Sequence, residues 1–244
     1  MKPYVYLGSL SVPVYFLMGL AGYLLAVTIA LIKRKAFGLR ARDTLRIAAL
    51  AMVGAVIGAR ILRSCVQILL RSGEPGFWTA ENWMLILKDS GMLYGALFGC
   101  VGMAALGAKL CRANIQSTFN VLAYAAIAFP SLARLGCWSA GCCYGIELAN
   151  GTRFPVQLFE AGYCVILLLA FLIIRPERRW PGIPLLPVNL IAYSAGRFIL
   201  EFFRGDENRG VWLLSTSQWI ALVLIALSVV WLRRNIFKHK TQAS

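Results

Sequence analysis

The sequence is poor in acidic residues and nearly free of histidine. Its 244 residues contain 10 Asp and Glu against 25 Lys and Arg, and the single histidine is His239. The 7 cysteines do not form paired Cys-x-x-Cys units, which excludes the usual spacing of a zinc-binding module. No convincing internal repeat, low-complexity tract or separate soluble domain is present. We therefore expect one domain over residues 1–244, with no metal and no cofactor.

Apolar residues are abundant instead, at 59% of the chain. The mean hydropathy is +0.70, well above that of soluble domains, which indicates an integral membrane protein. The first 32 residues carry one lysine and an apolar run too long for a cleavable signal. We predict an all-α polytopic protein of about seven transmembrane helices, at residues 11–32, 44–70, 91–110, 117–134, 156–174, 187–204 and 213–232.

Basic residues are concentrated in every second connection and at the C-terminus, in residues 33–42, 109–112, 175–179 and 233–240. The opposite connections, residues 71–83, 151–155 and 204–210, carry mixed charge. Because cytoplasmic loops are rich in Lys and Arg, the N-terminus is expected outside and the C-terminus in the cytoplasm. The formal net charge of +15 is then a consequence of topology, and we expect no nucleic-acid partner.

Several ionisable residues lie within the apolar segments, where charge is costly unless it faces a cavity or a partner. With this topology they gather in the outer half of the membrane. They are Arg60, Arg63, Arg134, Glu160, Arg197, Glu201 and Arg204.

Three interpretations compete for Arg197 and Glu201, which are four residues apart on one helical face. They can form a structural ion pair. Arg197 can instead bind a phosphate or carboxylate while Glu201 holds it in place. Snorkelling to the interface suits Arg204 better. Because several arginines gather on one side of the membrane, an anionic lipid headgroup is the natural ligand.

Two further segments are unusual. In residues 130–145, an apolar run is interrupted by Pro130, Gly136, Gly141 and Gly145. Irregular backbone within a membrane is tolerated where it lines a cavity. The alternative is a plain connection whose small residues allow close packing. In residues 89–100, glycines surround Tyr94, although a lone interfacial tyrosine is weak evidence of a site.

Six motifs in sequence resemble the prolipoprotein diacylglyceryl transferase family. "GAR" (58–60) is similar to the family's Gly-Ala-Arg, and "SGMLYGALFG" (90–99) to Gly-Gly-Met-x-Phe-His-Gly-Gly-Leu-x-Gly. "ARLGCWSAGCCYG" (133–145) resembles Gly-Arg-x-Gly-Asn-Phe-x-Asn-x-Glu-x-x-Gly, and "RFPVQLFE" (153–160) resembles Arg-His-Pro-x-Gln-Leu-Tyr-Glu. "GRFILEFFR" (196–204) and "LSTSQW" (214–219) resemble the family's Arg-Phe-x-x-Glu-Phe-Phe-Arg and Leu-Ser-x-x-Gln.

The resemblance implies transfer of the diacylglyceryl group of phosphatidylglycerol to the thiol of a lipobox cysteine, forming a thioether and releasing glycerol phosphate. It implies a multi-pass protein of the bacterial inner membrane with its site toward the outer leaflet. Its partners would be phosphatidylglycerol or another anionic phospholipid, a prelipoprotein signal peptide and the bilayer. By motif position the catalytic residues would be Arg134, Arg197, Tyr94 and Glu201. The substrate-binding residues would be Arg60, Tyr193, Gly145, Cys137, Gln157, Glu160, Arg204 and Gln218.

The chain departs from the family pattern at several positions. The family's histidine aligns with Tyr94, and His239 lies in the basic tail. The signature's two asparagines are Cys137 and Ala140, and its glutamate is Cys142. A tyrosine with an ordinary pKa near 10 is a poor base at neutral pH, although it can donate to a phosphate oxygen or act as a base beside arginines.

Two alternatives follow for the function. The first is a related transferase with another acceptor, such as a small thiol, an amine or a second lipid. The second is a non-catalytic phospholipid-binding protein or transporter.

The cysteines also allow several roles. Cys137, Cys142 and Cys143 can supply a nucleophilic or acyl-carrying thiol, form a disulfide, or serve as small packing residues.

Overall fold

A computed structural model describes residues 4–7, 10–73, 77–88, 93–205, 210–211 and 213–243. Residues 89–92 and 206–209, which belong to two of the stretches discussed above, lie outside the described residues. The chain divides into two compact units, residues 1–36 with 119–244 and residues 37–118. Each unit is described by itself, and the single domain over residues 1–244 stays a prediction.

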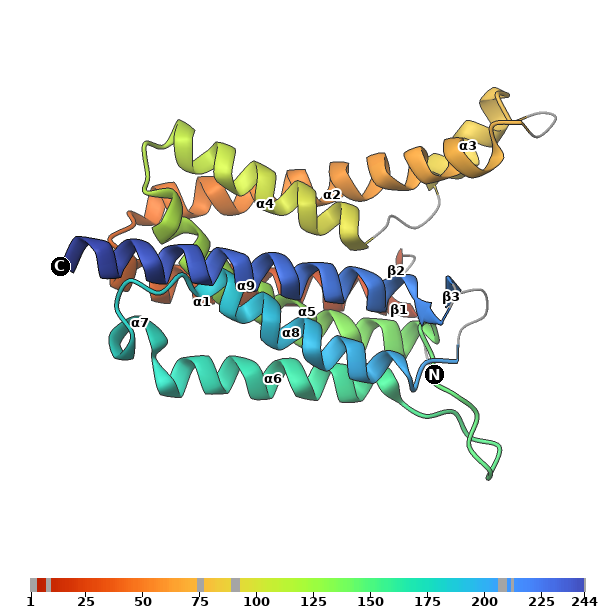
Figure 1. The fold of residues 1–244 in the computed structure, drawn as a ribbon. Helices are drawn as coiled ribbons and strands as arrows, with labels where there is room; N and C mark the ends of the chain where they lie inside the picture. The colour runs from red at the N-terminus through yellow and green to blue at the C-terminus, as the bar shows by residue number, and fades with distance from the viewer. Residues whose placement is uncertain are drawn as a thin grey trace. The chain divides into compact units, whose positions relative to one another are not determined.

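The first unit is a set of helices with two short β-hairpins (Figure 1). Its helices are α1 (Val14–Lys33), α5 (Ile115–Ala140, whose first turn precedes the unit), α6 (Val156–Ile174), α7 (Pro176–Arg179), α8 (Leu185–Glu201) and α9 (Thr216–Ala243). Strands β1 (Tyr4–Leu7) and β2 (Leu10–Pro13) form one antiparallel hairpin, and β3 (Gly210–Val211) and β4 (Leu214–Ser215) form the other.

Helix α5 is held against its neighbours by a few specific contacts. The side chain of Asn189 on α8 donates to the carbonyl of Ala123 at 3.1 Å. Gly22 of α1 lies so close to the backbone of Phe129 that a Cβ there would stand 2.6 Å from its carbonyl oxygen. Pro130 does not interrupt the helix, which continues to Ala140. The irregular backbone begins only at Gly141, which has φ +69°, so the expected interruption is shifted to the end of the helix.

The second unit consists of α2 (Ala41–Arg71), α3 (Ala80–Lys88) and α4 (Leu93–Leu110), preceded by the 3-10 turn η1 (Arg34–Phe37) at the boundary. Helices α2 and α4 lie antiparallel along each other (Figure 1). Gly54 and Gly58 of α2 face Gly99 and Gly95 of α4, and a Cβ at any of the four would collide with backbone across the interface. The glycines near Arg60 and Tyr94 therefore allow two helix backbones to touch, as small residues do in membrane helices.

Five helical segments among the described residues are long and apolar enough to cross a membrane: residues 14–37, 41–69, 115–140, 156–179 and 216–236. With large apolar side chains such as Leu69, Ile166 and Ile173 exposed, this describes an all-α, multi-pass membrane protein. Residues 94–110 form a shorter apolar helix, and α8 has 17 residues, below the roughly 20 of a full span. The number of seven spans and their orientation stay predictions.

Replacing Gly95 by alanine should weaken the α2–α4 contact, because the new methyl group meets the backbone of Gly58. Overpacking of this kind typically costs about 1–3 kcal/mol. The matched control is Gly102→Ala on the same helix, where nothing lies within 4 Å of the added Cβ. We expect the thermal unfolding midpoint in detergent to fall for Gly95→Ala and to stay or rise for Gly102→Ala. Equal midpoints would contradict the packing described here.

Candidate active site

The carboxylate of Glu160 is the centre of a buried polar cluster in the first unit. Its Oε1 lies 2.9 Å from Nη2 of Arg134 and accepts a 2.9 Å hydrogen bond from the hydroxyl of Tyr193. Its Oε2 lies 2.9 Å from Nη1 of Arg197. Glu160 is 2% exposed, and a charge so buried requires close partners. Arginines from α5 and α8 thus meet around one carboxylate of α6.

Arg197 is held by two carboxylates at once. While Nη1 contacts Glu160, Nη2 lies 2.9 Å from Oε2 of Glu201, one turn further along α8. The hydroxyl of Ser215 donates a 2.9 Å hydrogen bond to the other oxygen of Glu201. Because the guanidinium is planar and carries its donors in a fixed fork, these two carboxylates set its orientation as well as its position.

A third arginine adjoins the cluster. Nη1 of Arg204 lies 3.9 Å from Oε2 of Glu201, and its side chain is 8% exposed. Three guanidinium groups therefore contact the carboxylates of Glu160 and Glu201. Phosphate and carboxylate are the anions that guanidinium fits best.

The cluster forms where four elements of alternating direction meet. Arg134 lies near the end of α5 and Glu160 near the start of α6, while Arg197 lies near the end of α8 and Ser215 directly precedes α9. Consecutive antiparallel helices bring such positions to the same end of the bundle (Figure 1). Residues that are far apart in the sequence are therefore neighbours here.

The motif "LSTSQW" is a helix cap that supports this arrangement. The backbone N–H of Gln218 donates to Oγ of Ser215 at 3.2 Å, and the Gln218 side-chain oxygen accepts from the N–H of Ser215 at 2.9 Å. These reciprocal bonds are a capping box at the start of α9. The cap holds Ser215 where its hydroxyl reaches Glu201.

The loop between α5 and α6 is tied to the end of α8 through its backbone. The N–H of Ile146 donates to the carbonyl of Phe203 at 3.0 Å, and the N–H of Gly205 donates to the carbonyl of Tyr144 at 3.0 Å. A Cβ on Gly145 would collide with the carbonyl oxygen of Phe154 and come within 2.8 Å of that of Phe203. Glycine is therefore required at position 145 for close backbone approach.

Gln157 and the cysteine-rich turn belong to the same end of the first unit. The Gln157 side chain donates to the carbonyl of Cys142 at 2.8 Å. The Sγ atoms of Cys137, Cys142 and Cys143 lie within 4.8 Å of one another, and all three thiols are free. Hydrogen bonds from Cys137 and Cys142 lower the pKa of the Cys143 thiol, and the charges of Arg204 and Arg134 act in the same direction. Hydrogen bonding with the other two thiols raises the pKa of Cys142.

Two of the predicted site residues lie in the second unit. Arg60 is on α2 and Tyr94 is in the first turn of α4, and both side chains are partly exposed. Each is adjacent in sequence to the glycine contact between those helices. Their part in a site shared with Arg134 and Arg197 stays a prediction.

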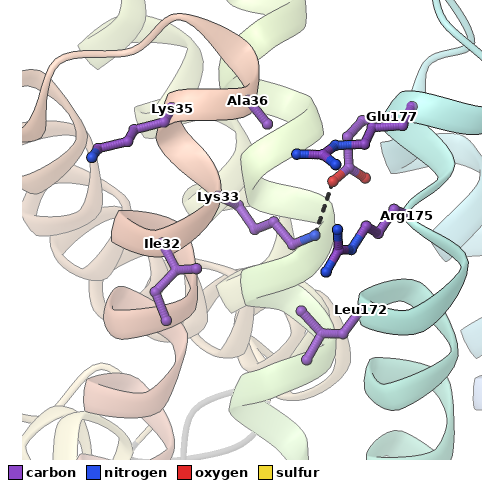
Figure 2. Close-up of a pocket in the computed structure, with 8 residues that line it drawn as sticks. Ile32, Lys33, Lys35, Ala36, Leu172, Arg175 and Glu177 are labelled. Carbon is purple, nitrogen blue, oxygen red and sulfur yellow. Dashed lines mark hydrogen bonds and ion pairs between the residues drawn. The ribbon is translucent and has the colours of Figure 1, made fainter.

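A separate polar group lies at the opposite end of the first unit, where α1 ends and α6 is followed by α7. Nζ of Lys33 lies 2.9 Å from Oε1 of Glu177 (Figure 2). It also lies 4.4 Å from the centre of the Tyr124 ring, and the Tyr124 hydroxyl donates a hydrogen bond to Glu177. A cavity of about 580 Å³ adjoins this pair. Its lining residues are Ile32, Lys33, Lys35, Ala36, Leu172, Arg175, Glu177 and Arg178. None of the motif residues named above lines it.

Sequence reasoning did not single out Ser215 or the central place of Glu160. Ser215 stands in a motif of which only Gln218 was selected, yet the spacing Ser-x-x-Gln before an apolar run is itself the signal of a capping box. The signal for Glu160 is the excess of buried arginine: a carboxylate must be found nearby, and few are available in this chain.

The three relatives of similar sequence described below carry the name of one enzyme. The chain is 29% identical over 217 residues to phosphatidylglycerol–prolipoprotein diacylglyceryl transferase 2 of Clostridium perfringens, covering 79% of each chain. It is 29% identical over 248 residues to the phosphatidylglycerol–prolipoprotein diacylglyceryl transferase of Clostridium tetani, covering 94% of this chain and 96% of the relative. The enzyme of that name from Campylobacter lari is 25% identical over 254 residues, with 89% of each chain covered.

The match also holds against the family as a whole. The model of the prolipoprotein diacylglyceryl transferase family matches residues 3–234, which include every residue of the buried cluster and both helices of the glycine contact. The resemblance inferred from the six motifs is therefore confirmed at the level of the family. This chain belongs to the prolipoprotein diacylglyceryl transferase family.

Proposed function

We propose that the chain transfers the diacylglyceryl group of phosphatidylglycerol to the lipobox cysteine of a prelipoprotein, at the outer leaflet of a bacterial cytoplasmic membrane. Its family and the names of its relatives support this reaction. The observation that carries the proposal is the meeting of Arg134 and Arg197 on Glu160 in a buried cluster.

The reaction forms one bond and breaks one. The acceptor sulfur attacks the glyceryl carbon that is bonded to a phosphate oxygen, the carbon–oxygen bond breaks, and glycerol phosphate leaves with the electron pair. The thiol proton goes to a base, because the thiolate is the effective nucleophile. Negative charge thus grows on the phosphate as the bond breaks, and the site must stabilise it.

Arg134 and Arg197 are suited to that task. Guanidinium remains charged when it is desolvated, and its five N–H donors let it contact a carboxylate and a phosphate together. In the structure Arg134 meets Glu160 through one terminal nitrogen, Nη2. We assign both arginines to binding the phosphodiester and stabilising the leaving glycerol phosphate.

Glu160 and Glu201 are assigned to positioning. They hold the two terminal nitrogens of the Arg197 guanidinium before the substrate binds, so little reorganisation is needed during the reaction. Gln218 acts through the capping box that holds Ser215 against Glu201. Gly145 acts through the close backbone approach of the loop to the end of α8.

The other assignments rest on motif position. Arg60, Tyr193, Cys137, Gln157 and Arg204 are proposed to line the substrate site. Tyr94 is proposed to take the role of the family's histidine. Of these residues, Tyr193 is supported further by its hydroxyl contact with Glu160.

Replacing Arg134 or Arg197 by lysine keeps the charge but removes the planar fork of N–H donors. The side chain can then no longer contact a carboxylate and the lipid phosphate in the same geometry. We expect kcat/KM to fall about 100-fold or more, the usual effect of removing one donor to a developing anion. The assay is formation of lipidated peptide from labelled phosphatidylglycerol and a lipobox peptide. Arg178→Lys, at the opposite end of the first unit, is the control and should retain wild-type activity. Wild-type activity in both site variants would contradict the assignment.

The same assay separates the alternatives. Lipidated peptide together with released glycerol phosphate supports the proposed reaction. Consumption of phosphatidylglycerol without lipidated peptide supports a related transferase with another acceptor. Binding of phosphatidylglycerol without consumption supports a non-catalytic lipid-binding protein or transporter.

Glu160→Gln should lower kcat, because the glutamine amide presents one oxygen and one N–H group where two guanidinium groups need two oxygens. Breaking a buried ion pair costs about 3–5 kcal/mol, so the unfolding midpoint should fall too. Activity is therefore measured well below that midpoint, with kcat and KM determined separately. Since the two arginines remain present, kcat should fall more than KM rises. The exposed Glu147→Gln is the control. An unchanged kcat would remove Glu160 from its positioning role.

Tyr94→Phe tests whether the hydroxyl has taken over the histidine's role. Only one oxygen atom is removed, so the helix and its glycine contact are preserved. We expect kcat for peptide lipidation to fall about 100-fold, at the low end for loss of a general acid or base. Tyr163→Phe, whose hydroxyl donates to the carbonyl of Ala192, is the matched control. Full activity in Tyr94→Phe would exclude the hydroxyl from the reaction.

A further inference from the structure

The turn that follows α5 gathers three thiols in a defined way. Gly141 has φ +69°, its N–H donates to the carbonyl of Trp138 at 3.2 Å, and the N–H of Cys142 donates to the carbonyl of Cys137 at 3.2 Å. These are the two hydrogen bonds of a Schellman motif, which ends a helix on a glycine. In that motif the residue after the glycine packs against the residue five positions before it, here Cys142 against Cys137.

A second reversal brings in the third thiol. Cys143 has φ +60°, a left-handed conformation that a residue with a side chain adopts only when its surroundings enforce it. The result is that all three Sγ atoms lie within 4.8 Å of one another. Cys137 is buried, while Cys142 is exposed and Cys143 is half-buried, so the group can be reached from outside.

We propose that Cys137, Cys142 and Cys143 form a binding site for one soft metal ion, monovalent copper. Thiolate sulfur selects soft ions such as Cu(I) and Zn(II), whereas the harder ions prefer oxygen. Structural zinc sites almost always have four protein ligands, and the donor set here is three sulfurs, which favours Cu(I) over structural zinc. Three sulfurs at about 2.3 Å from a central ion would stand about 4 Å apart, and the three observed Sγ atoms lie within 4.8 Å of one another.

The proposal does not depend on the transfer reaction, because it concerns binding alone.

The test uses full-length purified protein under anaerobic, reducing conditions, titrated with Cu(I) in competition with a chromophoric chelator. The absorbance of the chelator complex reports how much copper the protein withholds. We expect one ion per chain, and loss of that ion in Cys137→Ser, Cys142→Ser and Cys143→Ser. Cys65→Ser and Cys111→Ser are controls, because these thiols lie outside the cluster, and both should bind as the wild type does. Helical circular dichroism verifies the fold of each variant.

Three results would overturn the proposal: no copper withheld by the wild type, full binding retained in Cys142→Ser, or equal loss in Cys65→Ser. A preference for zinc over copper in the same competition would overturn the assignment of the ion. Since the exposed Cys142 is replaced by a residue of nearly the same size, loss of folding does not obscure the outcome. Loss of copper with unchanged peptide lipidation in Cys142→Ser or Cys143→Ser would still support the site, which keeps it separate from the proposed function.

Discussion

The site depends on one constraint: the guanidinium groups of Arg134, Arg197 and Arg204 are buried and meet the carboxylates of Glu160 and Glu201. Unpaired buried charge is prohibitively costly, so the helices that carry these residues must bring them together. The shared carboxylate of Glu160 is the contact that links α5, α6 and α8. The guanidinium groups gathered at this contact are the basis of the proposed lipid binding.

The elements around the cluster exist largely to hold it. The capping box at the start of α9 fixes Ser215, which fixes Glu201, which fixes Arg197. On the opposite side, Gly145 lets the loop after α5 pair with the end of α8 through backbone hydrogen bonds. Each device is local in sequence, but together they determine the direction of one guanidinium group. This preorganisation is what catalysis by charge stabilisation requires.

Much of the fold could be predicted, because hydropathy and the basic connections report directly on membrane helices. The family could also be predicted from six motifs in order, and the family model confirms it. The role of Glu160 could not be predicted, since its partners are 26 and 37 positions away in the sequence and only the tertiary structure brings them together. The predicted interruption at Pro130 was wrong for a related reason. Neighbouring helices can support a proline inside a membrane helix, and α5 continues through Pro130. The glycines near Tyr94 could be recognised in the sequence, but their role in a contact between two helices could not.

The most direct test of this account is a structure with phosphatidylglycerol bound. The account predicts that the lipid phosphate lies within hydrogen-bond distance, about 3 Å, of both Arg134 and Arg197, with Glu160 still in contact with at least one of them. A phosphate bound elsewhere, such as beside Lys33 and Arg175, with both arginines closed on Glu160 and no lipid between them, would contradict it.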